Sequence, residues 1–178
     1  MEVIIAAVVV TLFLFVWVSW TVTRLDRLQG RTALARSALD AALVRRAAAL
    51  QALASHPDTA LGPRREARLL ELAAASLDAD DSTREAAEND LSRALRDIPA
   101  GADPELLADL TEAARRVALA RRFYNDAVRD TRELRHRRLA RLLRVHAHRP
   151  LPRFFDIDDG LGPALSAAPP ADRGAERP

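Results

Sequence analysis

Apolar and polar residues follow two different patterns along this chain, and the pattern changes near residue 23. From Val3 to Thr23 no residue is charged, and such a stretch has the length of a helix that crosses the hydrocarbon core of a membrane. After residue 23, apolar residues recur at steps of three, four or seven, which is the spacing of one helix face. We therefore predict one helix to about residue 55, with a stripe formed by Leu25, Leu28, Ala35, Leu39, Leu43, Leu50 and Leu53.

Helix-breaking and capping residues divide the rest of the chain into three further predicted helices. Breakers at 56–63 separate the first helix from a second at 64–78, where Leu69, Leu70, Leu72 and Leu77 are the apolar residues. Ser82 and Glu85 have the spacing of a capping box, which predicts a third helix to about residue 97 with Leu91, Leu95 and Ile98 facing inward. Asp103 before Pro104 predicts a capped fourth helix to about residue 148, with the stripe Leu106, Leu110, Ala113, Val117, Ala120, Tyr124, Val128 and Thr131.

These elements predict an all-α protein with three parts. A transmembrane anchor occupies residues 1–23 and continues into an antiparallel up-and-down four-helix bundle over residues 24–158. Residues 159–178 are rich in Pro, Ala and Gly, which predicts a disordered tail. The composition agrees with helix, because Ala, Leu, Arg and Glu are abundant and only 4% of the residues are aromatic.

The residue content also excludes several kinds of chemistry. The chain has no Cys and no Lys, so disulfides, thiolate metal sites, Schiff bases and a P-loop lysine are absent. Carboxylate pairs fall in predicted turns, and His146 and His148 point to different faces of a helix, so neither set converges on one site. We expect no enzymatic activity, no metal and no cofactor.

The charges around the apolar stretch predict how it lies in a membrane. Only Glu2 and the α-amine precede it, and no small-residue cleavage site follows, so we expect an uncleaved anchor and not a signal peptide. Four arginines follow it, and the positive-inside rule then places the N-terminus outside and the body in the cytoplasm, at the cell (inner) membrane. These arginines are Arg24, Arg27, Arg31 and Arg36.

Tyr124 and Asn125 are candidate site residues because a lone Tyr stands beside an Asn in the middle of a predicted helix, where Asn is unfavourable. They could recognise a partner, but we favour a buried Tyr that anchors the bundle through its hydroxyl group. Asp40 lies beside the stripe of the first helix. From helix lengths we expect Asp40 to pair with Arg121 or Arg122.

Residues 135–149 hold six Arg and three His and no acid, and we call them the Arg-rich segment. It could be a solvated helix end, a lipid-binding surface or, less readily because aromatic residues are missing, a nucleic-acid site. We favour contact with anionic lipid over nucleic acid. The lipid-binding candidates are Arg135, Arg137, Arg138, Arg141 and Arg144.

Two stretches resemble the LemA family of bacterial membrane-anchored proteins. ALARRFYNDAVRD at 118–130 is similar to that family's A-R-R-x-Y-N-x-x-V-R-D signature, and ALDAALVRRAAAL at 38–50 to its I-D-V-Q-L-K-R-R run. Weaker similarity lies at 87–95 and 154–156. The resemblance singles out Asp40, Arg45, Arg46, Arg121, Arg122, Tyr124 and Asn125 as partner-binding or bundle-core residues.

The resemblance implies a divergent member of that family, because its I-P-N-L-V run and its second Y-N pair are replaced here. It also implies a four-helix bundle on a single N-terminal anchor and no enzymatic activity. We therefore expect a single-pass scaffold or adaptor for membrane or membrane-associated proteins, with an HtpX-like protease as a candidate partner. The alternative is a protein that organises anionic lipid through the Arg-rich segment, and no nucleic acid is expected.

Overall fold

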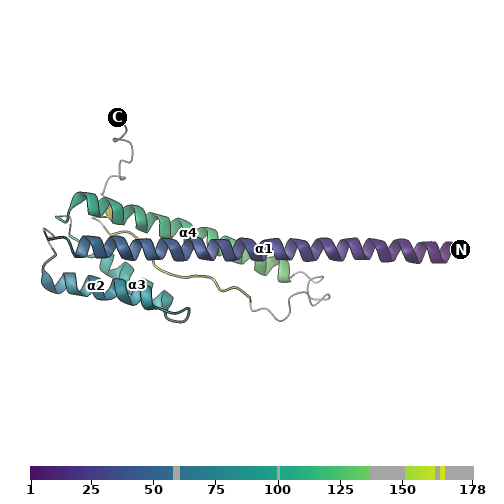
Figure 1. Cartoon of the computed structure of the whole chain (residues 1–178), viewed down its shortest axis with the longest axis horizontal. Coiled ribbons are helices and arrows are strands. Elements are labelled where there is room, and N and C mark those ends of the chain that lie inside the picture. The colour runs from purple at the N-terminus through teal and green to yellow at the C-terminus, as the bar shows by residue number, and fades with distance from the viewer. Residues whose placement is uncertain (58–60, 100, 137–150, 163–164, 167–178) are drawn as a thin grey trace, which may run out of the picture. The chain divides into compact units, whose positions relative to one another are not determined.

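The structure is a computed structural model that describes residues 1–57, 61–99, 101–136, 151–162 and 165–166. Within these residues four α-helices of eight residues or more form and no strand does, so the predicted all-α class is confirmed (Figure 1). The helices are α1 (Glu2–Ala54), α2 (Pro63–Asp78), α3 (Arg84–Arg96) and α4 (Pro104–His136). The chain divides into two compact units: unit 1 comprises Met1–Arg36 and Phe123–Phe154, and unit 2 comprises Ser37–Arg122 and Phe155–Pro178.

Three of the four helices begin where the sequence predicts. α1 starts at the second residue and ends one residue before the predicted limit, and α2 starts at Pro63, directly after Gly62 in a left-handed conformation (φ 75°). α4 has the predicted cap: Oδ1 of Asp103 accepts hydrogen bonds from the main-chain N–H groups of Glu105 (3.0 Å) and Leu106 (2.9 Å). The predicted continuation of α4 to residue 148 lies outside the described residues.

The predicted capping box of α3 is wrong. The N-cap residue is Thr83, and neither it nor Ser82 caps the helix through its side chain. Asp80 organises this turn instead, because its Oδ1 accepts hydrogen bonds from the N–H and hydroxyl groups of both Ser82 and Thr83, at 2.7 to 2.9 Å. A carboxylate two residues upstream offers a stronger acceptor than the Ser82 hydroxyl group, and the start of the helix moves accordingly.

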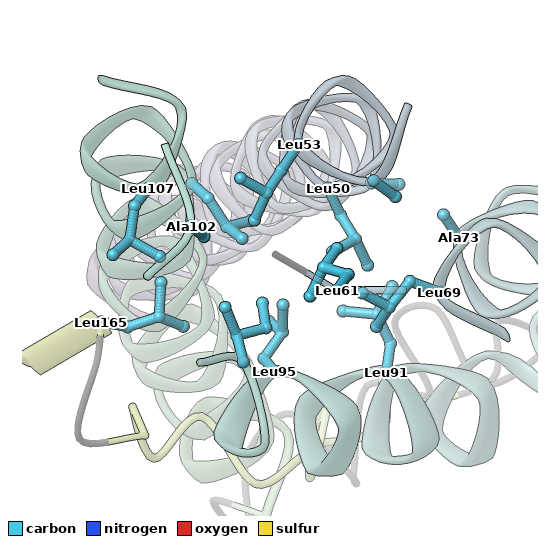
Figure 2. Close-up of a cluster of buried hydrophobic side chains, with 14 residues drawn as sticks. Leu50, Leu53, Leu61, Leu69, Ala73, Leu91, Leu95, Ala102, Leu107 and Leu165 are labelled. Atoms are coloured by element: carbon cyan, nitrogen blue, oxygen red, sulfur yellow. The ribbon is translucent and has the colours of Figure 1, made fainter. Parts of the chain in front are cut away.

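The hydrophobic core of unit 2 draws on all four helices. Leu50 and Leu53 of α1 meet Leu69 of α2, Leu91 and Leu95 of α3 and Leu107 of α4, and Figure 2 shows these side chains pointing toward one another. Leu39, Leu43, Leu50 and Leu53 are each no more than 1% exposed, as the heptad-like stripe predicts. The burial supplies the main stabilisation of the unit, at roughly 1.5 to 3 kcal/mol for each buried leucine.

Unit 1 contains the N-terminal part of α1 and the C-terminal part of α4. The hydroxyl groups of Thr32 and Thr131 are 3.0 Å apart, and Val128 is fully buried. The predicted burial of Tyr124 is confirmed: its side chain is 5% exposed and its hydroxyl group donates to the carbonyl oxygen of Arg153 at 2.8 Å.

Residues just before the predicted tail and Leu165 within it are buried against the helices of unit 2. Phe155, Ile157 and Leu165 are 3%, 4% and 0% exposed, and Leu165 belongs to the same core as Leu95 and Leu107 (Figure 2). The Thr111 hydroxyl group donates to the carbonyl oxygen of Leu165 at 3.3 Å. These residues, with Leu161 packed partly buried against the same core, hold the segment on the helices.

Candidate functional site

The N-terminal part of α1 has an unusual surface for a helix in water. Glu2–Trp20 is long and apolar enough to cross a membrane, and none of it is buried within the protein. Val3 is 81% exposed, Phe13 70% and Trp20 60%. A continuous apolar surface of this size marks contact with a membrane or with another protein.

A buried ion pair lies in the core of unit 2. Arg46 of α1 donates a charge-assisted hydrogen bond from Nη2 to Oε2 of Glu88 on α3, and the two residues are 2% and 0% exposed. Arg46 Nη1 also donates to the Ser92 hydroxyl group at 3.2 Å, while the Ser76 hydroxyl group of α2 donates to Glu88 Oε1 at 2.8 Å. These four residues form one ion-pair network that joins three helices.

The spacing of apolar residues does not reveal this ion-pair network, but the positions of its two charged residues do indicate it. Arg46 is three residues after Leu43, and Glu88 is three residues before Leu91, so each charge occupies a position of its helix's buried stripe. A charged residue at such a position must be paired to remain buried. The rule predicts that these two helices meet, although it does not say which acid meets which base.

A second arrangement of polar groups holds residues 155–162, which we call the acidic segment. The main-chain N–H of Asp156 donates to Glu85 Oε1 at 2.9 Å, and the N–H of Asp158 donates to Asn89 Oδ1 at 2.8 Å. Glu85 and Asn89 are one turn apart on α3. The helix side chains therefore hold the main chain of the segment at alternate residues.

Two arginines bind the carboxylates of the same segment. Arg96 of α3 pairs with Asp158, and Arg121 of α4 pairs with Asp159 at 2.8 Å. The N–H of Gly160 donates a hydrogen bond to Asp158 Oδ1, which is the main cause that lowers the pKa of Asp158, and the Arg96 hydrogen bond lowers it further. Asp158 therefore carries its negative charge at neutral pH.

The acidic segment approaches α3 closely at Gly162. A Cβ atom added there would lie 2.6 Å from the Cα atom and 2.8 Å from the carbonyl oxygen of Arg96. Only a residue without a side chain fits against this main chain. An open groove of about 520 Å³ runs beside the contact and is lined by Asn89, Arg93, Arg96, Asp156, Ile157 and Asp158.

The site residues predicted from the sequence do not share one set of contacts. Arg46 is buried in the ion-pair network, whereas Arg45 and Arg122 are exposed. Arg121 pairs with Asp159, and Asp40 is half-buried on α1, so the expected pairing of Asp40 with Arg121 or Arg122 stays a prediction.

Tyr124 and Asn125 belong to unit 1. Tyr124 is held by its hydrogen bond to Arg153, and the Arg36 guanidinium group lies 5.7 Å from its ring centroid; Asn125 is half-buried. These contacts agree with the anchoring role that we favour for Tyr124, and a partner-binding role remains a prediction.

The lipid-binding candidates are mostly outside the described part of the chain. Arg135 is half-buried near the end of α4, and the positions of Arg137, Arg138, Arg141 and Arg144 lie outside the described residues. Within the described ranges no group of three or more His, Asp or Glu side chains gathers where it could hold a metal ion.

Comparisons of the chain with protein-family models, with curated proteins and with solved structures found no match. The resemblance to the LemA family therefore stays a prediction from the residues that carry it.

Proposed function

We propose that this protein is a single-pass, membrane-anchored scaffold or adaptor without enzymatic activity, a divergent member of the LemA family. In this proposal the apolar part of α1 is the anchor, and the helices that follow form an antiparallel bundle in the cytoplasm. The bundle presents its surface to membrane or membrane-associated proteins, and an HtpX-like protease is one candidate partner.

The observation that carries the proposal is the continuity of α1. One uninterrupted helix of 53 residues contains both the unburied apolar stretch Glu2–Trp20 and the core leucines Leu39 to Leu53. Leaving some 20 apolar residues in water would cost tens of kcal/mol at about 0.8 kcal/mol for each CH₂ group. A membrane removes that cost, and the same helix then fixes the folded part to it.

Membrane anchoring is tested by placing charge within the apolar stretch. We expect Val10→Arg with Leu14→Arg to move the protein from the carbonate-resistant membrane fraction to the soluble or aggregated fraction, because each arginine at the bilayer centre costs about 2.5 to 3.5 kcal/mol. The matched control is Ala41→Arg with Ala48→Arg, at exposed positions of the same helix. Retention of the first variant in the membrane would contradict the anchor.

The orientation is tested separately with cysteines, since the chain has none of its own. We expect Glu2→Cys, and not Ser55→Cys, to react with an impermeant maleimide in intact cells. The reverse labelling would place the body outside the cytoplasm. Crosslinking in intact membranes followed by mass spectrometry then tests the adaptor role, and recovery of the chain with no reproducible protein neighbour would contradict it.

A second candidate function is a lipid-organising role for the Arg-rich segment. It is supported by the six arginines among residues 135–149 and the absence of any acid there. Each basic residue near an anionic surface contributes about 1 kcal/mol of binding free energy. This function would place the segment against the inner leaflet.

A further inference from the structure

α3 holds the acidic segment through its main chain, by hydrogen bonds from alternate residues. Glu85 and Asn89 are one turn apart, a rise of about 6 Å along the helix axis. The N–H groups of Asp156 and Asp158 are two residues apart, which is about 6.6 Å in an extended chain. The two spacings match, so successive turns of α3 accept hydrogen bonds from alternate residues of a chain that runs in the same direction as the helix.

The side chains of the acidic segment add selectivity to this main-chain recognition. Phe155 and Ile157 are buried, while Asp156 and Asp158 are exposed, so alternate residues face the helices and the solvent. Arg96 and Arg121 then bind the two consecutive acids at 158 and 159. The surface therefore fits the pattern apolar, exposed, apolar, acidic, acidic.

We propose that this surface, the α3 groove (Glu85, Asn89, Arg93, Arg96 and Arg121), is a recognition site for an extended segment of a partner protein with that pattern. The chain's own acidic segment is then an intramolecular competitor that occupies the site until a partner replaces it. The inference names the class of partner that the proposed adaptor would bind. Its biological role rests on the proposed function, whereas binding of the segment does not.

The exposure of the ion pair between Arg96 and Asp158 allows replacement by a segment of a different protein. Arg93 and Arg96 line the open groove together with residues 156–158, and Arg93 pairs with Asp90 on the same helix. The Arg96 and Asp158 side chains are 39% and 49% exposed, so water can replace this ion pair at little cost. A partner segment with the same pattern regains each contact that the chain's own segment gives up, and net affinity then depends mainly on the cost of association.

The experiment measures binding of a fluorescent peptide with the sequence of residues 153–162 to the full chain in detergent micelles. We expect weak binding to the wild-type chain, because its own segment competes. Ile157→Asp places a charge where a buried apolar side chain belongs and displaces that segment, so the peptide should bind at least about tenfold more tightly. Leu151→Asp, at an exposed position just before the segment, is the matched control and should behave as wild type.

The contacts of the groove are tested in the Ile157→Asp chain. There Arg96→Glu should weaken peptide binding about tenfold, and a peptide with Arg in place of Asp158 should restore it. Glu85→Ala and Asn89→Ala should each weaken binding about threefold, since each removes one acceptor for a main-chain N–H group.

A second measurement covers the case in which Ile157→Asp does not fold, as judged by circular dichroism. Excess unlabelled peptide should then accelerate hydrogen exchange at the amides of residues 156 and 158 in the wild-type chain. Gly162→Ala, which clashes with the main chain at Arg96, should accelerate exchange at the same two amides without any peptide. Slow exchange at both amides in all these samples would overturn the proposal.

Two further results would also overturn it. One is a folded Ile157→Asp chain that fails to bind the peptide. The other is a dimer that forms in the wild-type chain without peptide and disappears on Ile157→Asp, because the occupant would then be a second copy of this chain. Neither result bears on the membrane anchor, which is tested by fractionation alone.

Discussion

Removing the carboxylate of Glu88 should be the most destabilising single change at a charged residue. Glu88 is fully buried and accepts hydrogen bonds from Arg46 and Ser76, and the Arg84 guanidinium group lies 3.9 Å away. Glu88→Ala therefore leaves Arg46 buried without its counter-ion. Breaking a buried pair in this way costs about 3 to 5 kcal/mol, which is far more than the worth of a surface pair.

The structure provides a matched control for this change. Arg68 and Glu71 on α2 form an ion pair at 2.9 Å, but their side chains are 59% and 69% exposed. Glu71→Ala should cost no more than about 0.5 kcal/mol. Replacing both buried partners, as Arg46→Met with Glu88→Leu, removes the uncompensated charge, so this double variant should be far more stable than Glu88→Ala alone.

The measurement is thermal and urea unfolding of the full chain in detergent, followed by circular dichroism. For a chain of this size, 3 to 5 kcal/mol corresponds to a fall in Tm of roughly 6 to 20 °C. The reasoning would be refuted if Glu88→Ala and Glu71→Ala lowered Tm equally, or if the double variant were no more stable than Glu88→Ala.

Three other predictions concern particular contacts. The pKa of Asp80 is lowered from 3.8 to about 2, mainly by hydrogen bonds from the hydroxyl groups of Ser82 and Thr83. The ionised Asp80 therefore stabilises the turn fully above pH 3.8, and this stabilisation is lost as the pH falls toward 2. An NMR titration of the carboxyl group that gives an ordinary pKa would contradict this. Tyr124→Phe should cost about 0.5 to 1.5 kcal/mol in urea unfolding, because it removes the hydrogen bond to Arg153, and an unchanged midpoint would argue against that bond. A shortened chain beginning at Arg24 should co-sediment with anionic vesicles more than with neutral ones, and less so in high salt. Changing Arg137, Arg138, Arg141 and Arg144 to Gln should abolish this preference, and indifference to lipid charge would exclude the lipid-organising role.

The sequence by itself determined the helices and most of the buried residues. Periodic leucines such as Leu43 and Leu95 show which face of each helix is buried, because amphipathic spacing depends only on neighbouring residues of the same helix. The same holds for the cap at Asp103, whose N–H donors lie within three residues, and for the apolar composition of the first 20 residues. The predicted cap at Ser82 was wrong because two local acceptors competed and the Asp80 carboxylate was the stronger.

The tertiary structure alone decided which charges meet and where the acidic segment lies. Arg46 and Glu88 are 42 residues apart and Asn89 and Asp158 are 69 apart, and no local pattern states which partner among many arginines and acids a given residue takes. Residues 159–178 were assigned to a disordered tail because they are rich in Pro, Ala and Gly. Leu165 of that range is nevertheless buried, as are Phe155 and Ile157 just before it, since the helices already provide a surface on which a few apolar side chains hold an extended chain. Composition indicates how much apolar surface a segment can bury within itself. Only the fold determines which apolar surface of the rest of the protein lies next to it.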